Sequence, residues 1–315
     1  MTRKDSVVIG CGYWGKNIIA NVFNEGRLSS VVDFNKNLER EYLEKFKLQP
    51  TSLKEIESSS NIKNIFIVTP AETHYELTAN FLQLGKNCFV EKPLCLDLAE
   101  AERLGSLSKK NSKVLMVGHL LQYHPCYRKL REIVLAKDEK IISVKSTRKS
   151  FGKLRKNENV LWSFAPHDIS MILRILEGDI KVHGTSKTNL FDEKTYDAID
   201  AAFRIGHTEV KLSLDWSSTV KEQKIEVAFK DEIYVFEDST ADFNKKLYRY
   251  NVGISQESLQ SKNSLEKEYI EVNSDMSPLE YEIKHFFDCV DNEQEPLTNY
   301  LESLKVIKVL NALDE

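Results

Sequence analysis

The sequence predicts an α/β fold with two domains: a doubly wound parallel sheet, then a domain with a large, open and mostly antiparallel sheet. Over the first 120 residues, short apolar runs alternate with stretches of helical periodicity, which is typical of parallel strands covered by helices on both faces. From about residue 180 to 273, apolar and polar residues alternate with a period of two, as in strands with one covered face. A length of 315 residues, at roughly 150 per domain, agrees with two domains. We therefore expect domains at 1–120 and 121–315.

Five apolar runs mark the strands of the first domain, and each ends at a glycine, an acidic residue or a Thr-Pro turn. The runs are Val7–Ile9, Val31–Val32, Ile65–Val68, Cys88–Val90 and Val114–Val117. In open parallel sheets, ligands bind outside the carboxyl ends of the strands. The residues that follow these runs are therefore candidates for a binding site.

The second domain is expected to combine helices with long strands. A helix from Pro125 to about Leu135 precedes a strand at Ile141–Thr147, and a second helix carries the apolar residues of 169–176. Strands such as 209–214 then follow in series without intervening helices, which favours an α+β arrangement.

Composition and cysteine use argue against several classes of protein. The 44 basic and 48 acidic residues give a net charge of −4, which is not typical of a nucleic-acid-binding protein. No stretch of about 18 apolar residues predicts a membrane-spanning helix, and the N-terminus does not resemble a signal peptide. The five cysteines include no C-x-x-C pair, and no histidine spacing suggests a metal site. We expect a cytoplasmic protein with free cysteines, no metal, and no nucleic-acid or membrane partner.

A glycine motif follows the first strand run directly. Residues 10–15 read Gly-Cys-Gly-Tyr-Trp-Gly, a match to G-x-G-x-x-G placed before a helical stretch. In this motif the first glycine allows a tight turn, the second lets the backbone approach a pyrophosphate, and the third permits close helix packing. Asp33 ends the next run and can accept hydrogen bonds from ribose hydroxyls while repelling a 2′-phosphate, although Lys36 is a nearby positive charge. We therefore expect NAD as the cofactor, with NADP as the less favoured alternative.

The ends of the later strand runs add candidates for the cofactor site. Lys92 stands between Glu91 and the rigid Pro93, a position that favours a role in the site over the usual solvated surface charge. The residues expected to contact the dinucleotide are Gly10, Gly12, Tyr13, Trp14, Gly15, Asp33, Thr69, Pro70, His74, Glu91 and Lys92.

Several motifs occur in a fixed order along nearly the whole chain. They are GCGYWG at 10–15, TPAETH at 69–74, EKP at 91–93, GHLLQYHP at 118–125, WSFAPHDIS at 162–170 and PLEYEIKHFFDCV at 278–290. Together they resemble the glucose–fructose oxidoreductase / inositol dehydrogenase family, also called Gfo/Idh/MocA. The resemblance implies a Rossmann domain, a C-terminal domain with a large open sheet, and NAD(P)-linked oxidation or reduction of a sugar, cyclitol or nucleotide sugar.

The resemblance also implies which residues are catalytic. In that family the lysine of EKP touches the reacting hydroxyl, and a histidine in the segment matching WSFAPHDIS commonly acts as acid/base; here these are Lys92 and His167. We expect His167 to accept the hydroxyl proton, because an imidazole titrates near neutral pH, and Lys92 to stabilise the developing alkoxide. Many members carry an aspartate four residues before the histidine, where this chain has Ser163. Asp168 is not a simple substitute, because adjacent side chains on a helix point apart.

Substrate recognition rests on fewer residues. A basic segment precedes His167 and consists of Arg148, Lys149, Lys153, Arg155 and Lys156. Such a segment is either a solvated loop or a site for a carboxylate or diphosphate, as on a nucleotide sugar. We expect Tyr123, Arg148 and His167 to contact the substrate; the alternative for His167 is a structural residue bonded to backbone near a helix start.

These observations predict an NAD-dependent oxidoreductase that transfers a hydride between a nicotinamide cofactor and a hydroxyl or keto carbon of a sugar or nucleotide sugar. The alternatives are an NADPH-preferring ketosugar reductase and a cyclitol dehydrogenase of the inositol type. A non-catalytic dinucleotide sensor is a third alternative, because Ser163 stands at the position of the usual aspartate.

The resemblance further implies a homodimer or homotetramer that packs through the open face of the second sheet. One apolar stripe, Val210, Leu212, Leu214 and Trp216, lies on one side of a predicted strand. This stripe either forms such an interface or packs against the domain's own helices.

Overall fold

The structure is a computed structural model that describes residues 3–152, 158–191, 195–252 and 266–315. The chain forms two compact units. The first consists of Met1–Tyr123 and Met276–Ile307, and the second of His124–Asp275 and Lys308–Glu315. The sequence assigned every residue after 120 to the second domain, whereas in the structure 276–307 return to the first unit.

The first unit contains a five-stranded, wholly parallel sheet. Its strands are β1 (Ser6–Ile9), β2 (Leu28–Val32), β3 (Asn64–Ile67), β4 (Asn87–Glu91) and β5 (Leu115–Gly118). They lie in the order β2-β1-β3-β4-β5. This arrangement is the predicted doubly wound domain, and the nearly continuous burial of its strands explains why they read as apolar runs.

The sheet is accompanied by helices of the same unit. They are α1 (Gly15–Asn24), α2 (Lys36–Phe46), α3 (Leu53–Ser58), α4 (His74–Gln83), α5 (Leu98–Lys110), α8 (Pro278–Asp291) and most of α9 (Tyr300–Asp314), with short 3₁₀ turns η1 (Ala71–Thr73) and η2 (Leu120–Tyr123). The core between α8 and the sheet is aromatic. The Phe286 ring lies 4.9 Å from that of Phe66 and 6.0 Å from that of Phe89, between centroids. Contacts of this geometry add stability beyond that of area burial.

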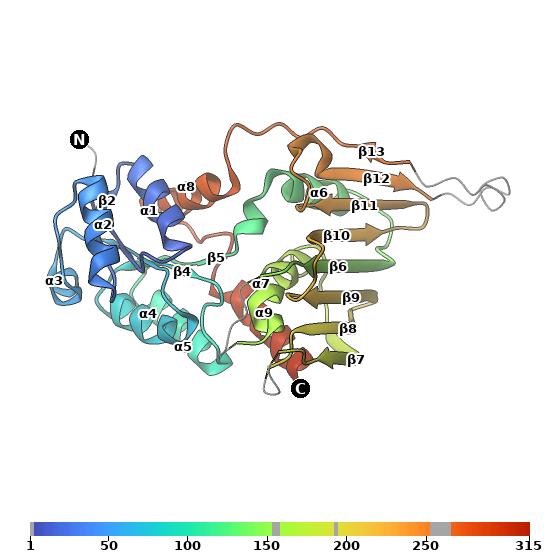
Figure 1. Ribbon diagram of the computed structural model, residues 1–315, viewed down its shortest axis with the longest axis horizontal. Coiled ribbons are helices and arrows are strands. Elements are labelled where there is room, and N and C mark those ends of the chain that lie inside the picture. The colour runs from blue at the N-terminus through green and yellow to red at the C-terminus, as the bar shows by residue number, and fades with distance from the viewer. Residues whose placement is uncertain (1–2, 153–157, 192–194, 253–265) are drawn as a thin grey trace. The chain divides into compact units, whose positions relative to one another are not determined.

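The second unit is built on an eight-stranded sheet that is antiparallel except for one pair. Its strands are β6 (Ser143–Lys149), β7 (Ile180–Thr188), β8 (Ala198–Ile205), β9 (Thr208–Asp215), β10 (Glu222–Ala228), β11 (Glu232–Glu237), β12 (Leu247–Asn251) and β13 (Glu268–Tyr269). Their order is β13-β12-β11-β10-β6-β9-β8-β7, and only β6 and β9 pair in parallel. Helices α6 (Pro125–Leu135) and α7 (Val160–Ile172) pack on this sheet, and η3 (Phe243–Lys245) precedes β12 (Figure 1).

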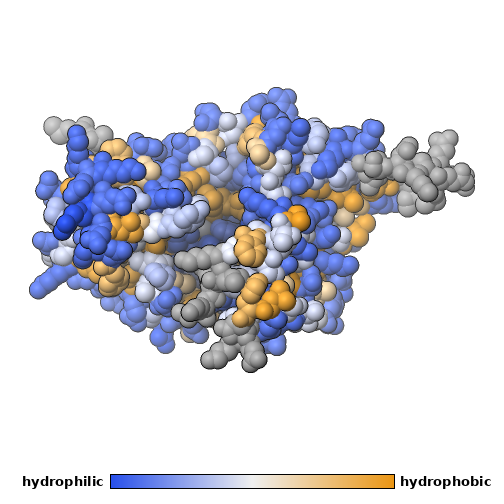
Figure 2. All heavy atoms as spheres, viewed as in Figure 1, coloured by the Kyte–Doolittle hydropathy of each residue, from blue (hydrophilic) through white to orange (hydrophobic). Residues whose placement is uncertain are grey.

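The apolar stripe of β9 is internal to the second unit. Val210, Leu212, Leu214 and Trp216 are each at most 1% exposed, and β9 packs against α7. The Trp216 indole also donates a hydrogen bond to Asp197 at 2.6 Å. Of the two expectations for this stripe, packing against the unit's own helices is therefore confirmed. The face shown in Figure 2 is mostly hydrophilic, with smaller hydrophobic patches.

The five cysteines are free and buried. Burial raises the pKa of each thiol, so they pack as small protonated hydrophobic groups. Among the described residues, no helix is both long and apolar enough to cross a membrane.

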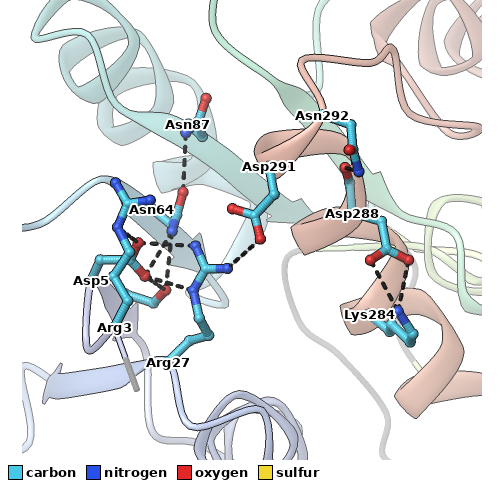
Figure 3. Close-up of polar contacts among 10 residues, drawn as sticks. Arg3, Asp5, Arg27, Asn64, Asn87, Lys284, Asp288, Asp291 and Asn292 are labelled. Carbon is cyan, nitrogen blue, oxygen red and sulfur yellow. Dashed lines mark hydrogen bonds and ion pairs between the residues drawn. The ribbon is translucent and has the colours of Figure 1, made fainter. Parts of the chain in front are cut away.

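Helix α8 is tied to the amino edge of the first sheet by charged groups (Figure 3). Arg27, just before β2, donates to Asp291 at the end of α8 at 2.8 Å. The same guanidinium donates two bonds of 2.9 Å to Asp5, which also accepts a bond from Asn64. Its plane lies 4.5 Å from the Phe287 ring centroid. These contacts, together with the Phe286 packing, account for the return of the C-terminal segment to the first unit.

Candidate dinucleotide and catalytic site

The glycine loop has the geometry that its motif predicts. Gly10 has φ +103°, and a Cβ there would lie 2.5 Å from the carbonyl oxygen of Val68. A Cβ at Gly15 would lie 2.1 Å from the carbonyl oxygen of Gly10, so the start of α1 packs directly on the turn. A Cβ at Gly12 would meet nothing within 4 Å. The loop therefore leaves space above Gly12 at the N-terminus of a helix, where a phosphate is favoured.

A cavity of about 710 Å³ lies beside this loop, within the first unit. Its apolar lining consists mainly of Ile9, Val32, Phe34, Leu53, Val68, Pro70 and Leu77. Asp33, Asn35 and Lys36 supply polar groups at the end of β2. An apolar slot with a few polar groups at one side is the usual form of a small-molecule site, and its position next to the loop suits the adenosine half of a dinucleotide.

Asp33 is fixed by the backbone around it. Its Oδ2 accepts the N–H of Cys11 at 2.6 Å and its Oδ1 accepts the N–H of Asn35 at 2.7 Å. The Lys36 ammonium is paired with Glu39 at 2.7 Å, and Glu39 also accepts the backbone N–H of Asp33 at 2.8 Å. Glu39 is a site residue that the sequence analysis missed. Its spacing of three from Lys36 in a helical stretch is the signal that could have found it.

His74 joins the ends of two neighbouring strands. It is 1% exposed, with Nδ1 2.7 Å from the carbonyl oxygen of Pro93 and Nε2 2.8 Å from that of Thr69. Burial lowers its pKa. Both ring nitrogens contact the protein's own backbone, so a contact of His74 with the dinucleotide stays a prediction. Thr69 and Pro70 line the cavity, as a cofactor contact would require.

Lys92 follows the last residue of β4. Glu91 accepts the Trp14 indole N–H at 2.5 Å and the backbone N–H of Lys92 at 3.2 Å. Burial raises the pKa of Glu91 to about 7, against the lowering effects of the indole bond and the Lys92 charge. At the end of β5, burial and then the Lys92 charge lower the pKa of His119 to about 3. His119 is therefore neutral at physiological pH, and Lys92 is the cation of this strand edge.

His167 lies on α7 in the second unit. The helix begins after Asn159, whose side chain accepts the N–H of Trp162, and Pro166 is inside it. His167 is half-buried, and its carbonyl accepts a bond from Ser170 at 2.9 Å. Lys92 and His167 belong to different units, so their joint action stays a prediction.

Asp168 points into the second unit, toward β6. Its carboxylate accepts Arg148 Nε at 2.6 Å and the Ser146 hydroxyl at 2.7 Å, and it is 1% exposed. Arg148 is only 8% exposed, and its guanidinium is bound to the buried carboxylate of Asp168. A contact of Arg148 with the substrate stays a prediction. Lys149, the last residue of β6, lines a hollow on the second sheet, and Lys153, Arg155 and Lys156 lie outside the described residues.

Two further residues at this edge of the first unit are buried. Tyr123, expected at the substrate, is 1% exposed with its hydroxyl 3.0 Å from that of Thr298. Glu282 of α8 is fully buried, and neither carboxyl oxygen has a hydrogen-bond partner among the described residues. Burial, and then the charge of Glu91, raise its pKa well above the ordinary value. The sequence analysis missed Glu282. This glutamate lies four residues before Phe286, on the apolar face of a predicted helix, and that position could have indicated a buried carboxyl group.

Comparison with known proteins agrees with this geometry. A family model described as "Oxidoreductase family, NAD-binding Rossmann fold" (GFO_IDH_MocA) matches residues 4–119. Residues 4–119 are therefore similar to the NAD-binding Rossmann domain of the Gfo/Idh/MocA oxidoreductases. The match covers the glycine loop, the cavity and Lys92.

Two relatives share part of this segment. UDP-N-acetylglucosamine 3-dehydrogenase of Acidithiobacillus ferrooxidans is 29% identical over 126 residues, or 40% of each chain. The scyllo-inositol 2-dehydrogenase (NAD(+)) of Bacillus subtilis is 33% identical over 73 residues, 23% of this chain and 21% of that protein. The aligned segments thus span two fifths or less of the length of these relatives.

Solved structures share the fold over nearly the whole length. The A. ferrooxidans dehydrogenase has a TM-score of 0.83 at 20% identity, over 98% of this chain and 95% of that one. A 3-ketoreductase variant from Actinomadura kijaniata, in complex with TDP-benzene and NADP, has a TM-score of 0.81 at 15% identity, over 98% and 96%. At these identities the likeness establishes the fold of both units.

Proposed function

We propose that this protein is an NAD-dependent oxidoreductase that transfers a hydride between a nicotinamide cofactor and a hydroxyl or keto carbon of a sugar or nucleotide sugar. The observation that carries the proposal is the glycine loop, with open space above Gly12 and an adjoining cavity of about 710 Å³ that ends at Asp33. Relatives named for their action on UDP-N-acetylglucosamine and scyllo-inositol support the class of substrate.

The preference for NAD over NADP rests on charge at the end of β2. The Asp33 carboxylate lines the cavity and would accept hydrogen bonds from ribose hydroxyls, while its charge would repel a 2′-phosphate. Two lysines are among the described residues that line the cavity, Lys36 and Lys54. Lys36, beside Asp33, is paired with Glu39, so its charge is largely offset. The NADP complex of the 3-ketoreductase makes this preference worth a direct test.

The bound nicotinamide would supply the hydride acceptor in oxidation and the donor in reduction. We propose that the Lys92 ammonium donates a hydrogen bond to the reacting oxygen and stabilises its negative charge. His167 accepts the hydroxyl proton in oxidation and returns it in reduction. Oxidation releases one proton overall, which His167 takes from the hydroxyl and then passes to solvent, and reduction takes up one proton by the same route.

Calorimetric titration with NADH and NADPH tests the cofactor assignment, after any copurified nucleotide has been removed. We expect NADH to bind more tightly, and Asp33→Ser to narrow or reverse the preference because it removes the charge that repels a 2′-phosphate. Asp288→Asn is the matched control, since that exposed carboxylate on α8 pairs only with Lys284 among the described residues. NADPH preference in the wild type would favour the ketosugar reductase, and binding of neither would contradict the proposal.

Turnover with sugars, nucleotide sugars and inositols tests the catalytic assignment. Lys92→Ala should lower kcat at least about 10²–10³-fold, the usual effect of losing one donor to a developing oxyanion, and leave NADH binding nearly intact. Lys110→Ala, an exposed lysine on α5, is the control. Retained activity in Lys92→Ala would contradict the role of this lysine. NADH binding without turnover on any of these substrates would favour the dinucleotide sensor.

We further propose that two or four copies associate, as the family resemblance implies, through the sheet face opposite α6 and α7. That face carries a hollow of about 670 Å³ lined in part by Lys145, Lys211 and Ser186. Light scattering at several concentrations would measure the assembly. The cytoplasmic location stays a prediction.

A further inference from the structure

We propose that Glu91 is a positioning residue whose carboxylate joins the glycine loop to the backbone of the catalytic lysine. The inference rests on the proposed function, because it assigns Glu91 a part in presenting Lys92 to the reacting oxygen. It differs from the expected role of Glu91 as a contact of the dinucleotide. The acting groups are Trp14, Glu91 and Lys92, all in the first unit.

The contacts of Glu91 are the first support. Its Oε1 accepts the indole N–H of Trp14 at 2.5 Å, across 77 residues of sequence. Its Oε2 accepts the backbone N–H of Lys92 at 3.2 Å. Trp14 is the residue directly before Gly15 at the start of α1, and it packs on the hydrophobic core. One carboxylate therefore links the turn expected to hold the phosphates with the peptide that carries the lysine.

The second support is the space reserved for this carboxylate. Gly118 lies opposite Glu91 in the register of β4 and β5. A Cβ at position 118 would lie 3.0–3.2 Å from the carboxyl atoms of Glu91, closer than ordinary contact. A larger residue there would displace the carboxylate from the Trp14 indole. The absence of a side chain at Gly118 thus preserves the link.

A second contact holds the same peptide segment from its other side. His74 lies with Nδ1 2.7 Å from the Pro93 carbonyl oxygen. Lys92 is therefore presented from a backbone that is bonded both before and after it. Catalytic groups must be held within a fraction of an ångström of their working position, and such supporting bonds are the usual means.

The charge of Glu91 should matter to this role. A carboxylate accepts two donors, whereas the protonated acid has less acceptor capacity and adds a donor. The groups that face it are the cationic Lys92, the neutral acid Glu282 and, beyond Lys92, the neutral His119. Since the pKa of Glu91 lies at about 7, about half of the links should be formed at pH 7, with most of them formed by about pH 8 and fewer at lower pH.

Kinetics of Glu91→Gln, Trp14→Phe and the double variant test the proposal. At pH 8 we expect Glu91→Gln to lower kcat at least tenfold while the Kd for NADH changes less than about threefold. In the reductive direction, where His167 must carry the proton that it donates, the wild-type loss of kcat below pH 7 should be absent in Glu91→Gln. Because both single variants break one link, the double variant should be no slower than Glu91→Gln. Glu44→Gln, an exposed glutamate on α2, controls for the substitution itself.

A readout independent of turnover separates this inference from the proposed function. The indole N–H signal of Trp14 in ¹H–¹⁵N NMR, assigned by its loss in Trp14→Phe, should titrate with a midpoint near pH 7 in the wild type and not in Glu91→Gln. Unchanged kcat in Glu91→Gln, or an indole signal that does not titrate, would overturn the proposal. Loss of NADH binding in Glu91→Gln would do the same, because it would make Glu91 a cofactor ligand. If the wild type turns over no sugar, the proposed function fails, and the titration still decides whether Glu91 holds the loop.

Discussion

Replacing Glu282 by glutamine should change how the stability of the protein depends on pH. Glu282 is fully buried on α8, and neither of its carboxyl oxygens has a hydrogen-bond partner within the described part of the chain. Burial and the neighbouring charge of Glu91 raise its pKa well above 4.5, so the folded protein keeps this proton to a higher pH than the unfolded chain does. Glutamine has nearly the shape of the protonated acid, so the substitution removes the titration with little change in packing.

The sign and size of the effect follow from proton linkage. Above its ordinary pKa the unfolded chain has released the Glu282 proton, whereas the folded chain still holds it. Stability therefore falls as pH rises, by about 1.4 kcal/mol per pH unit for one proton. Over the pH range in which the folded protein holds this proton and the unfolded chain has released it, the wild type should lose stability relative to Glu282→Gln at this rate. Titration of Glu91 also lowers the stability as pH rises, both in the wild type and in Glu282→Gln. Its effect therefore largely cancels when the stabilities of the two proteins are compared.

Urea denaturation at pH 5, 6, 7 and 8, followed by circular dichroism, measures this difference. The unfolding midpoint of Glu282→Gln should rise steadily above that of the wild type as pH increases, while Glu44→Gln should follow the wild type. Parallel curves for wild type and Glu282→Gln would refute the reasoning, because Glu282 would then titrate alike in the folded and unfolded states. A variant that loses stability relative to the wild type at high pH would show that the buried carboxylate is ionised and satisfied.

Two further substitutions test the loop and the buried ion pair. In Gly10→Ala the added methyl group would lie 2.5 Å from the Val68 carbonyl oxygen, on a backbone with positive φ. We therefore expect a destabilisation of about 1–3 kcal/mol and weaker NADH binding. An unchanged melting temperature and NADH affinity would contradict the described turn. Asp168→Ala leaves the guanidinium of Arg148 buried without its carboxylate, so we expect a loss of about 3–5 kcal/mol in urea denaturation. The double variant Arg148→Met/Asp168→Leu should recover most of that loss, and a single variant as stable as the wild type would disprove the pair's importance.

Local features of the fold and site were readable because their causes are local. The strand Val7–Ile9 is buried on both faces and therefore appears as a continuous apolar run. The turn after it needs a positive φ and therefore a glycine at position 10. Asp33 is recognisable because it ends the next strand, at the usual spacing from the glycine motif. The same holds for the long strands of the second sheet, where alternating burial follows the period of two.

Contacts between distant segments were not readable in this way. The Trp14–Glu91 bond joins residues 77 positions apart, and Arg148 pairs with Asp168 across 20 residues, between a strand and a helix. From sequence, Arg148 was expected at the substrate, because a cation in a basic segment looks the same whether solvated, ligand-facing or buried against a carboxylate. Which partner it meets depends on where α7 lies on the sheet.

The sequence by itself determined the fold class, the dinucleotide motif and the family resemblance of the first domain, because these depend on periodicity and on a few residue types at set spacings. Only the tertiary structure decided that the C-terminal helix α8 folds with the first unit, that the β9 stripe packs internally, and that Lys36 is offset by Glu39. Each of these outcomes depends on which surfaces meet in space. The free energy of burying a side chain or forming an ion pair depends on which residues come into contact in the folded protein. The pattern of residues along the chain does not identify each of those contacts.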